Sequence, residues 1–216
     1  MLPQRTALPF PNPDGKVRIA VFSGSFNPVH TGHAALASYM AQCVGGIDEV
    51  WMLVSPQNPL KPSLGLLPDD VRLAMVRLVC DAVPGLRASD FEFSLPRPSF
   101  TYRTLCSLRE SFPQHQFQLV IGSDNWHIFG SWRNPDEIIR QFGLIIYPRP
   151  GFFIDPTQLP DNVEYLPDAP VIEISSTWIR QQLALGLDMN YFLPQSVYDY
   201  IVTNRLYGAA GPAARR

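Results

Sequence analysis

Short apolar runs alternate with helical patterns along most of the chain. The runs bounded by turn residues are typical of strands, and they lie at residues 18–23, 49–55, 86–92, 117–122, 143–147 and 171–175. The segment 69–83 instead repeats apolar residues at a spacing of three or four, with Val71, Met75, Leu78 and Ala82 on one face, which predicts a helix. Strands and helices in alternation predict an α/β fold with a parallel sheet covered by helices on both faces.

One domain, spanning residues 17–207, accounts for these elements. The chain has 216 residues, of which 46% are hydrophobic, enough to build one sizeable core. Residues 1–16 are rich in proline and show little periodicity, so they are expected to form an N-terminal extension, and residues 208–216 a flexible tail. In a parallel sheet, ligands bind beyond the carboxyl ends of the strands, so functional residues are sought directly after each strand.

Charge and composition narrow the class of partner. Lys and Arg number 17 against 19 Asp and Glu, so the net charge of -2 gives no reason to expect nucleic acid, and a small phosphorylated ligand needs only a local positive patch. No apolar run approaches the roughly 18 residues that span a bilayer, and no basic and apolar leader begins the chain, which favours a cytoplasmic protein without a membrane partner. Cys43, Cys80 and Cys106 lie apart in apolar stretches and are interpreted as buried free thiols.

The first predicted strand is followed by a small-residue turn and two histidines. Gly24 and Gly32 permit close backbone approach, and the start of the next helix offers free N–H groups and a positive dipole end to phosphate. His30 and His33 are three residues apart, so both rings lie on one helical face and can donate hydrogen bonds to the same polyphosphate. Two alternatives stay open, namely histidines that only pack and a zinc site, which would need a third ligand. The segment has neither the three-glycine dinucleotide motif nor the Gly-Lys-Ser/Thr ending of a P-loop.

A second strand-to-helix junction lies near the end of the chain, in the run ISSTWIR at residues 174–180. Ser175 or Ser176 can cap the helix that continues to Leu185, and the first N–H groups of that helix then face any anion placed there. Arg180 lies one turn into the helix and carries a planar fork suited to phosphate oxygens. An ordinary capped helix with a solvated arginine is the alternative.

The middle of the chain carries a third candidate, the run IGSDNW at residues 121–126. Asp124 directly follows a strand and a glycine loop, where a carboxylate can accept hydrogen bonds from ribose hydroxyls. The indole rings of Trp126 and Trp132 offer flat faces on which a pyridine or purine ring can stack. A helix cap at Asp124 and core packing of both tryptophans are the alternatives.

Together, GSFNPVHTGH at residues 24–33 and ISSTWIR at 174–180 resemble the two signature motifs of bacterial nicotinate-nucleotide adenylyltransferases, members of the nucleotidyltransferase superfamily with a Rossmann-like fold. The resemblance extends from about residue 18 to about residue 207, through looser matches at 55–61, 98–102, 121–132 and 149–151. Relatives usually carry Thr and Asp at the positions of Ser25 and Asn27, so this chain lacks a carboxylate that the family form has.

The resemblance implies transfer of the AMP unit of ATP to nicotinate mononucleotide, giving nicotinate adenine dinucleotide (deamido-NAD) and pyrophosphate in NAD biosynthesis. It implies catalytic roles for His30, His33 and Arg180. Residues expected at ATP are Gly24, Ser25, Phe26, Gly122, Asp124, Arg149, Ser176 and Thr177, and those expected at the mononucleotide are Asn58, Lys61, Thr101, Tyr102 and Trp132.

The implied reaction calls for alignment and charge stabilisation rather than for a general base, because the mononucleotide phosphate is already an anion. Mg²⁺ is expected as a cofactor held mainly by the ATP phosphates, since the sequence shows no carboxylate cluster dedicated to a metal. Alternatives are a nicotinamide mononucleotide or pantetheine-phosphate adenylyltransferase and, from another class, a non-catalytic nucleotide-sensing module. The sequence leaves a monomer and a homo-oligomer open.

Overall fold

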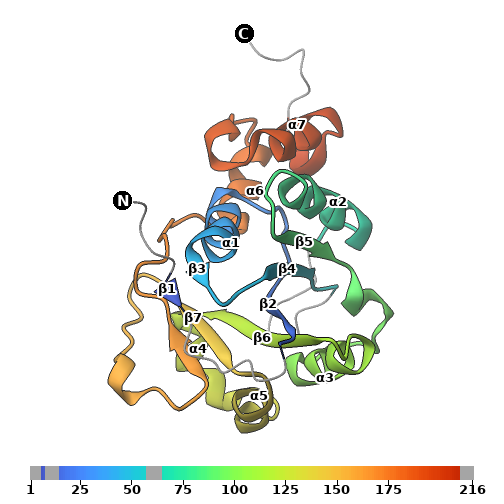
Figure 1. Ribbon diagram of the computed structural model, residues 1–216. Coiled ribbons are helices and arrows are strands. Elements are labelled where there is room, and N and C mark those ends of the chain that lie inside the picture. Colours follow the sequence, from blue (N-terminus) through green and yellow to red (C-terminus); the bar gives the residue numbers. More distant parts are fainter. Residues whose placement is uncertain (1–5, 8–14, 57–64, 210–216) are drawn as a thin grey trace.

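A six-stranded parallel sheet forms the middle layer of the molecule, in the strand order β5-β4-β2-β6-β7-β8 (Figure 1). Its strands are β2 (Val17–Gly24), β4 (Glu49–Val54), β5 (Leu86–Ser89), β6 (His115–Gly122), β7 (Leu144–Tyr147) and β8 (Val163–Tyr165). A separate two-stranded pair joins β1 (Thr6–Ala7) to β3 (Val44–Gly45), also in parallel. The computed structural model describes residues 6–7, 15–56 and 65–209.

Helices cover both faces of this sheet. The helices of the described residues are α1 (Thr31–Cys43), α2 (Asp69–Cys80), α3 (Thr101–Ser111), α4 (Ser123–His127), α5 (Pro135–Phe142), α6 (Ser176–Ala184) and α7 (Gln195–Thr203), with short 3-10 helices η1 (Phe91–Ser94), η2 (Phe129–Ser131), η3 (Pro156–Gln158), η4 (Asn190–Phe192) and η5 (Leu206–Gly208). One core cluster draws on α1, α2, α6 and α7, and a second draws on α3 and α5 across the sheet (Figure 1). Successive residues of β2 alternate between the clusters, with Ile19 in one and Ala20 in the other. The predicted α/β fold is therefore confirmed.

The order of the strands reverses at β2. From β2 the chain proceeds outward through β4 to β5, and it then returns to β6 on the other side of β2 and continues to β7 and β8. The carboxyl ends of β2 and β6 therefore border a topological switch point, the place where open parallel sheets bind ligands. Gly24 ends β2 and Gly122 ends β6, so two of the predicted glycine loops begin at this point.

The prediction of a strand at residues 171–175 is wrong. The sheet edge beside β7 is taken by the three-residue strand β8, which the sequence analysis missed. Residues 171–175 instead carry the chain past the start of α1, where a Cβ added to Gly32 would lie 3.4 Å from the Ile172 carbonyl oxygen. Val171 is 52% exposed, and the N–H of Ile174 bonds locally to Ile172. An alternating apolar pattern thus describes an extended connection here rather than a paired strand.

Smaller predictions also need correction. The strand expected at 86–92 ends at Ser89, because η1 begins two residues later. The helix expected at 69–83 ends at Cys80, and its buried face is turned relative to the predicted one. That face consists of Arg72, Leu73, Met75, Val76, Val79 and Cys80. Of the three cysteines only Cys80 is buried, whereas Cys43 is exposed and Cys106 is half-buried.

Within the described parts of the chain, no helix is long and apolar enough to cross a membrane. The longest of the helices whose bounds are given above, α1, has 13 residues, well short of the roughly 20 apolar residues that a bilayer requires.

A pair of matched valine substitutions tests the assignment of the sheet edge. Val163 on β8 is 8% exposed, whereas Val171 is 52% exposed. Val163→Ala removes buried methyl groups and should lower the free energy of unfolding by about 1–3 kcal/mol. Val171→Ala should change it by less than about 0.5 kcal/mol. Urea unfolding followed by circular dichroism measures both, and equal losses in the two variants would contradict the edge assignment.

Candidate functional site

The loop after β2 folds back on itself and supports one of the two histidines. Phe26 has a left-handed backbone (φ 44) and is 2% exposed. A Cβ on Gly24 would lie 3.0 Å from the Phe26 ring, so only glycine leaves room for the ring there. The Phe26 ring in turn meets the His33 ring edge to face, with 5.1 Å between the centroids. Gly24 and Phe26 therefore shape the loop and hold the histidine.

His30 and His33 lie against each other at the start of α1. Their rings stack with 3.7 Å between centroids, and His30 is 5% exposed. The backbone N–H of His30 donates to Nδ1 of His33 (3.3 Å), so a neutral His33 carries its proton on Nε2. A Cβ on Gly32 would lie 3.2 Å from the His30 ring, which explains the glycine between the two histidines. The predicted placement of both rings on one face is confirmed.

The electrostatics of this pair keep His30 uncharged. Burial, the larger cause, and the positive charge of Arg149 together lower the pKa of His30 from 6.5 to about 4. At neutral pH the buried imidazole is therefore a neutral ring with one N–H donor. Arg149, which follows β7, is therefore close enough to the histidine pair for its charge to act on His30.

Helix α6 docks directly on the histidine loop. Ser176 Oγ donates to the carbonyl oxygen of Pro28 (2.8 Å), and Arg180 Nη1 donates to that of Asn27 (2.8 Å). Ser175 is the N-cap of α6, because its Oγ accepts from the Trp178 N–H (3.2 Å). The two motifs, separated by about 150 positions, thus form one unit. The side chains predicted to hold phosphate also fasten the loops together.

The remaining member of that motif, Thr177, lies exposed in the first turn of α6. Its Oγ1 accepts from Arg180 Nη2 at 3.5 Å. Thr177 therefore lies beside Arg180 on the solvent side, where a ligand can reach its hydroxyl.

The contacts of Asn27 explain why an amide stands where relatives usually carry an aspartate. Its Nδ2 donates to the carbonyl oxygen of Gly65 (2.8 Å), and its Oδ1 accepts from the Leu67 N–H (3.2 Å) and the Tyr207 hydroxyl (2.8 Å). The side chain is 3% exposed. A carboxylate accepts but does not donate, so it cannot make the bond to Gly65. The amide therefore fastens both the chain after residue 64 and the C-terminal end of the domain to the histidine loop.

Arg72 is a further residue of the site region that the sequence analysis missed. It is fully buried, and its guanidinium donates to the carbonyl oxygens of Ser25 (2.6 Å), Ser55 (2.9 Å) and Leu67 (3.0 Å). Asp69 pairs with it at 2.5 Å. The sequence signal was an arginine between apolar residues, with an aspartate three positions earlier. Ser25, predicted at ATP, is thus held through its main chain.

The end of β6 is joined to the end of β7. Ser123 is fully buried, and its Oγ accepts from the Arg149 N–H (2.8 Å). Arg149 Nε lies 3.8 Å from Asp124 Oδ2. A Cβ on Gly122 would collide with Asp124 Oδ1 and lie 2.9 Å from Cγ of Arg149, so glycine is required where these chains approach. The structure brings Gly122, Asp124 and Arg149 together, as the sequence predicted.

Three of the residues predicted for the mononucleotide, Thr101, Tyr102 and Trp132, lie on the α3 side of the sheet. Thr101 and Tyr102 begin α3, and the Tyr102 hydroxyl accepts from Gln141 Nε2 (3.1 Å). The Trp132 ring packs at 5.3 Å from the Phe129 ring, and its Nε1 is buried without a hydrogen-bond partner among the described residues. Asn58 and Lys61 lie outside the described residues.

Two of these segments touch through residues that lie next to the predicted ones in the sequence. The guanidinium of Arg133 lies 4.7 Å from the centre of the Phe100 ring. Phe100 directly precedes α3, and Arg133 directly follows Trp132. The Trp132 segment and the start of α3 are therefore neighbours.

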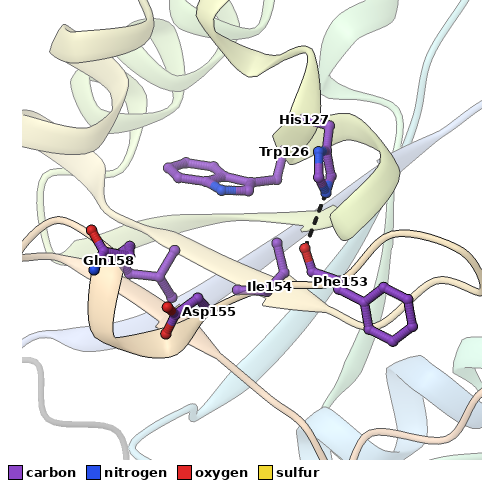
Figure 2. A pocket seen from close by; sticks show the side chains of 7 residues that line it. Trp126, His127, Phe153, Ile154, Asp155 and Gln158 are labelled. Atoms are coloured by element: carbon purple, nitrogen blue, oxygen red, sulfur yellow. Dashed lines mark hydrogen bonds between the residues drawn. The ribbon is translucent and has the colours of Figure 1, made fainter.

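A pocket of about 340 Å³ lies apart from these residues, between α4 and the chain after β7 (Figure 2). It is lined by Trp126, His127, Phe153, Ile154, Asp155, Gln158 and Leu159. A ring nitrogen of His127 lies 3.1 Å from the Phe153 carbonyl oxygen, as the dashed line in Figure 2 marks. None of the residues predicted for ATP or the mononucleotide lines this pocket. In the described ranges, no three His, Cys, Asp or Glu residues gather closely enough to hold a metal ion.

Comparison with known proteins identifies the family. The family model for cytidylyltransferase-like proteins matches residues 21–182. A probable nicotinate-nucleotide adenylyltransferase of Bacteroides fragilis is 49% identical over 187 residues, which cover 87% of this chain and 92% of the relative. A protein of the same description from Bacteroides thetaiotaomicron is 50% identical over 186 residues, covering 86% and 91%.

Among solved structures, the nicotinic acid mononucleotide adenylyltransferase of Plasmodium falciparum complexed with NaAD superposes with a TM-score of 0.73. The match covers 90% of this chain and 98% of that chain at 21% identity, so it shows a shared fold. The assignment to a family rests on the two Bacteroides sequences and on the family model that matches residues 21–182. By both, this chain belongs to the nicotinate-nucleotide adenylyltransferase family, within the cytidylyltransferase-like proteins.

Proposed function

We propose that this protein transfers the AMP unit of ATP to nicotinate mononucleotide, forming nicotinate adenine dinucleotide and releasing pyrophosphate. The observation that carries the proposal is the docking of α6 on the histidine loop through Ser176 and Arg180. It gathers two histidine rings, an arginine and the first turns of two helices at one strand end, a combination suited to a polyphosphate. The names of the closely related bacterial proteins support the same substrates.

In the proposed reaction, a phosphate oxygen of the mononucleotide attacks the α-phosphorus of ATP. The bond between the α- and β-phosphates breaks, and pyrophosphate leaves with the electron pair. The nucleophile is already an anion, so the protein contributes alignment and stabilisation of charge. We assign hydrogen-bond donation to the phosphoryl oxygens to His30 and His33, and support of the leaving group to Arg180 and Thr177. Mg²⁺ bound to the ATP phosphates would neutralise part of their charge, and it would be held mainly by those phosphates rather than by side chains of the described residues.

We propose that the acceptor lies toward α3. Asp124, expected at ATP, would accept hydrogen bonds from ribose hydroxyls where the two substrates meet, and Arg149 Nε lies 3.8 Å from its Oδ2. Trp132 would stack on the pyridine ring, and its neighbour Arg133 lies against Phe100 at the entrance to α3. Thr101 and Tyr102 follow directly, so main-chain groups there would meet the substituent on the ring.

A comparison of acceptors tests the proposed function. The purified protein with ATP and Mg²⁺ should release pyrophosphate with nicotinate mononucleotide at a kcat/KM at least about tenfold above that with nicotinamide mononucleotide, because the two differ by one group worth roughly 1–3 kcal/mol of recognition. A coupled pyrophosphate assay measures both, with phosphopantetheine as a third acceptor. Turnover only with phosphopantetheine, or with no acceptor, would overturn the proposal.

Removal of the buried histidine should impair the chemical step. His30→Ala should lower kcat by about 10²–10³, the range for loss of a preorganised donor to a developing charge. His127→Ala is the matched control, because His127 is exposed and its ring nitrogen contacts the Phe153 carbonyl oxygen rather than a residue assigned to the reaction. Circular dichroism establishes that both variants fold. Unchanged kcat in a folded His30→Ala protein would remove His30 from the mechanism.

The lowered pKa of His30 predicts a specific acid sensitivity. Between pH 6.5 and about 4 the unfolded chain binds a proton at this residue and the folded protein does not. His30 therefore adds a loss of stability as the pH falls through this window, of up to about 1.4 kcal/mol per pH unit. His30→Gln lacks this contribution, so the wild type should lose more stability than the variant between pH 6.5 and 4.5. Urea unfolding of both proteins measures the difference, and parallel pH profiles would contradict the buried neutral ring.

A further inference from the structure

A buried carboxylate lies under the mononucleotide side of the site and has no part in the proposed chemistry. Glu92 belongs to η1 and is 4% exposed. Hydroxyl groups donate to both of its oxygens, namely Ser55 Oγ (2.7 Å) and Ser99 Oγ (3.2 Å) to Oε2, and Thr104 Oγ1 (2.9 Å) to Oε1. A carboxylate accepts at several lone pairs, so all three bonds can form at once.

Two of the donors enclose the segment expected at the pyridine ring. Ser99 directly precedes Phe100, and Thr104 lies in the first turn of α3. Thr104 Oγ1 also lies 3.4 Å from the Phe100 carbonyl oxygen. Glu92 therefore holds the chain on either side of residues 100–103. The main-chain groups of that short stretch have little freedom once both ends are fixed.

The third donor connects Glu92 to the other half of the site. Ser55 directly follows β4. Its Oγ lies 3.1 Å from Ser23 Oγ, one residue before the Gly24 that ends β2. Side chains thus run without interruption from the end of β2 through Ser55 and Glu92 to the start of α3. The same network therefore joins the strand end before the histidine loop, predicted at ATP, to the start of α3, predicted at the mononucleotide.

Burying a carboxylate costs free energy of desolvation, whereas burying an apolar side chain in a purely structural position would not. Burial raises the pKa of Glu92, and the three hydroxyl donors oppose that shift. Apolar residues of similar volume often serve stability as well as buried polar networks do. What apolar residues cannot supply is a single acceptor that fixes three separate segments in one geometry.

We propose that Glu92 is a positioning residue for the pyridine mononucleotide, holding Ser55 at the end of β4 and the start of α3 in the arrangement that receives it. This inference rests on the proposed function. Glu92 is buried and would touch neither substrate, and it acts through Ser55, Ser99 and Thr104. Its effect should therefore fall on one substrate rather than on the chemistry of phosphoryl transfer.

Glu92→Gln tests the proposal, because it keeps the shape of the side chain and removes the anionic acceptor. The KM for nicotinate mononucleotide should rise about 10- to 100-fold, the range for loss of hydrogen bonds to a charged group. The KM for ATP and the kcat should stay within about threefold of wild type. Glu164→Gln is the matched control, because Glu164 is also partly buried with a raised pKa but lies on the edge strand β8. It should leave both KM values unchanged.

The outcomes separate the positioning role from a structural one. Equal rises in both KM values, or a lowered melting temperature with unchanged KM values, would overturn the proposal. If Glu92→Gln does not fold, Thr104→Val and Ser99→Ala each remove one donor, and the same split between the two KM values is required of them. A wild-type protein that releases no pyrophosphate with either pyridine mononucleotide sinks the proposed function as well. An active wild type whose variants show no split sinks the positioning role alone.

Discussion

The buried guanidinium of Arg72 is the interaction on which the geometry of the site depends. It donates to carbonyl oxygens of Ser25, Ser55 and Leu67, which belong to loops far apart in the sequence. Loops have no ladder in which to satisfy their carbonyl groups, so converging loops at a dry strand end need a fixed donor. The planar fork of arginine offers several N–H groups in one rigid unit, and Asp69 compensates its charge. The main chain at Ser25, Ser55 and Leu67 is therefore held in place before a ligand arrives.

Asn27 and Glu92 extend this arrangement in opposite directions from Arg72. Asn27 joins the histidine loop to Gly65, Leu67 and Tyr207, and so ties the C-terminal end of the domain to the proposed ATP side. Glu92 gathers hydroxyl groups on the proposed mononucleotide side. Each uses one buried side chain to hold several segments of main chain. A reaction that depends on alignment rather than on a base gains most from such preorganisation, because misplacement of a substrate costs rate directly.

The sequence predicted what local patterns encode and missed what tertiary contacts decide. Strand, glycine turn and helix start are adjacent in the chain, so the loops at Gly24 and Gly122 and the cap of α6 were accessible from local chemistry. The segment 171–175 has the alternation of a strand, but β8 already occupies the edge that it would need. Arg72 was invisible as a site residue because a single arginine on an amphipathic helix ordinarily faces water. Its burial follows from three loops that the helix happens to meet, which no window of sequence contains.

Burial of His30 separates two roles around the proposed triphosphate, namely hydrogen-bond donation by a neutral ring and attraction by positive charge. Its pKa is lowered to about 4 by burial and by Arg149, so the ring is neutral at neutral pH and would act in the proposed reaction as an uncharged donor. Positive charge is left to Arg149 and Arg180, which are partly exposed and do not bear the cost of a buried ion. A neutral donor in a dry position forms a strong hydrogen bond to developing charge without adding a fixed cation that would retain pyrophosphate. In the proposed mechanism the stacked histidines would therefore favour the transition state, while the partly exposed arginines would attract the substrate.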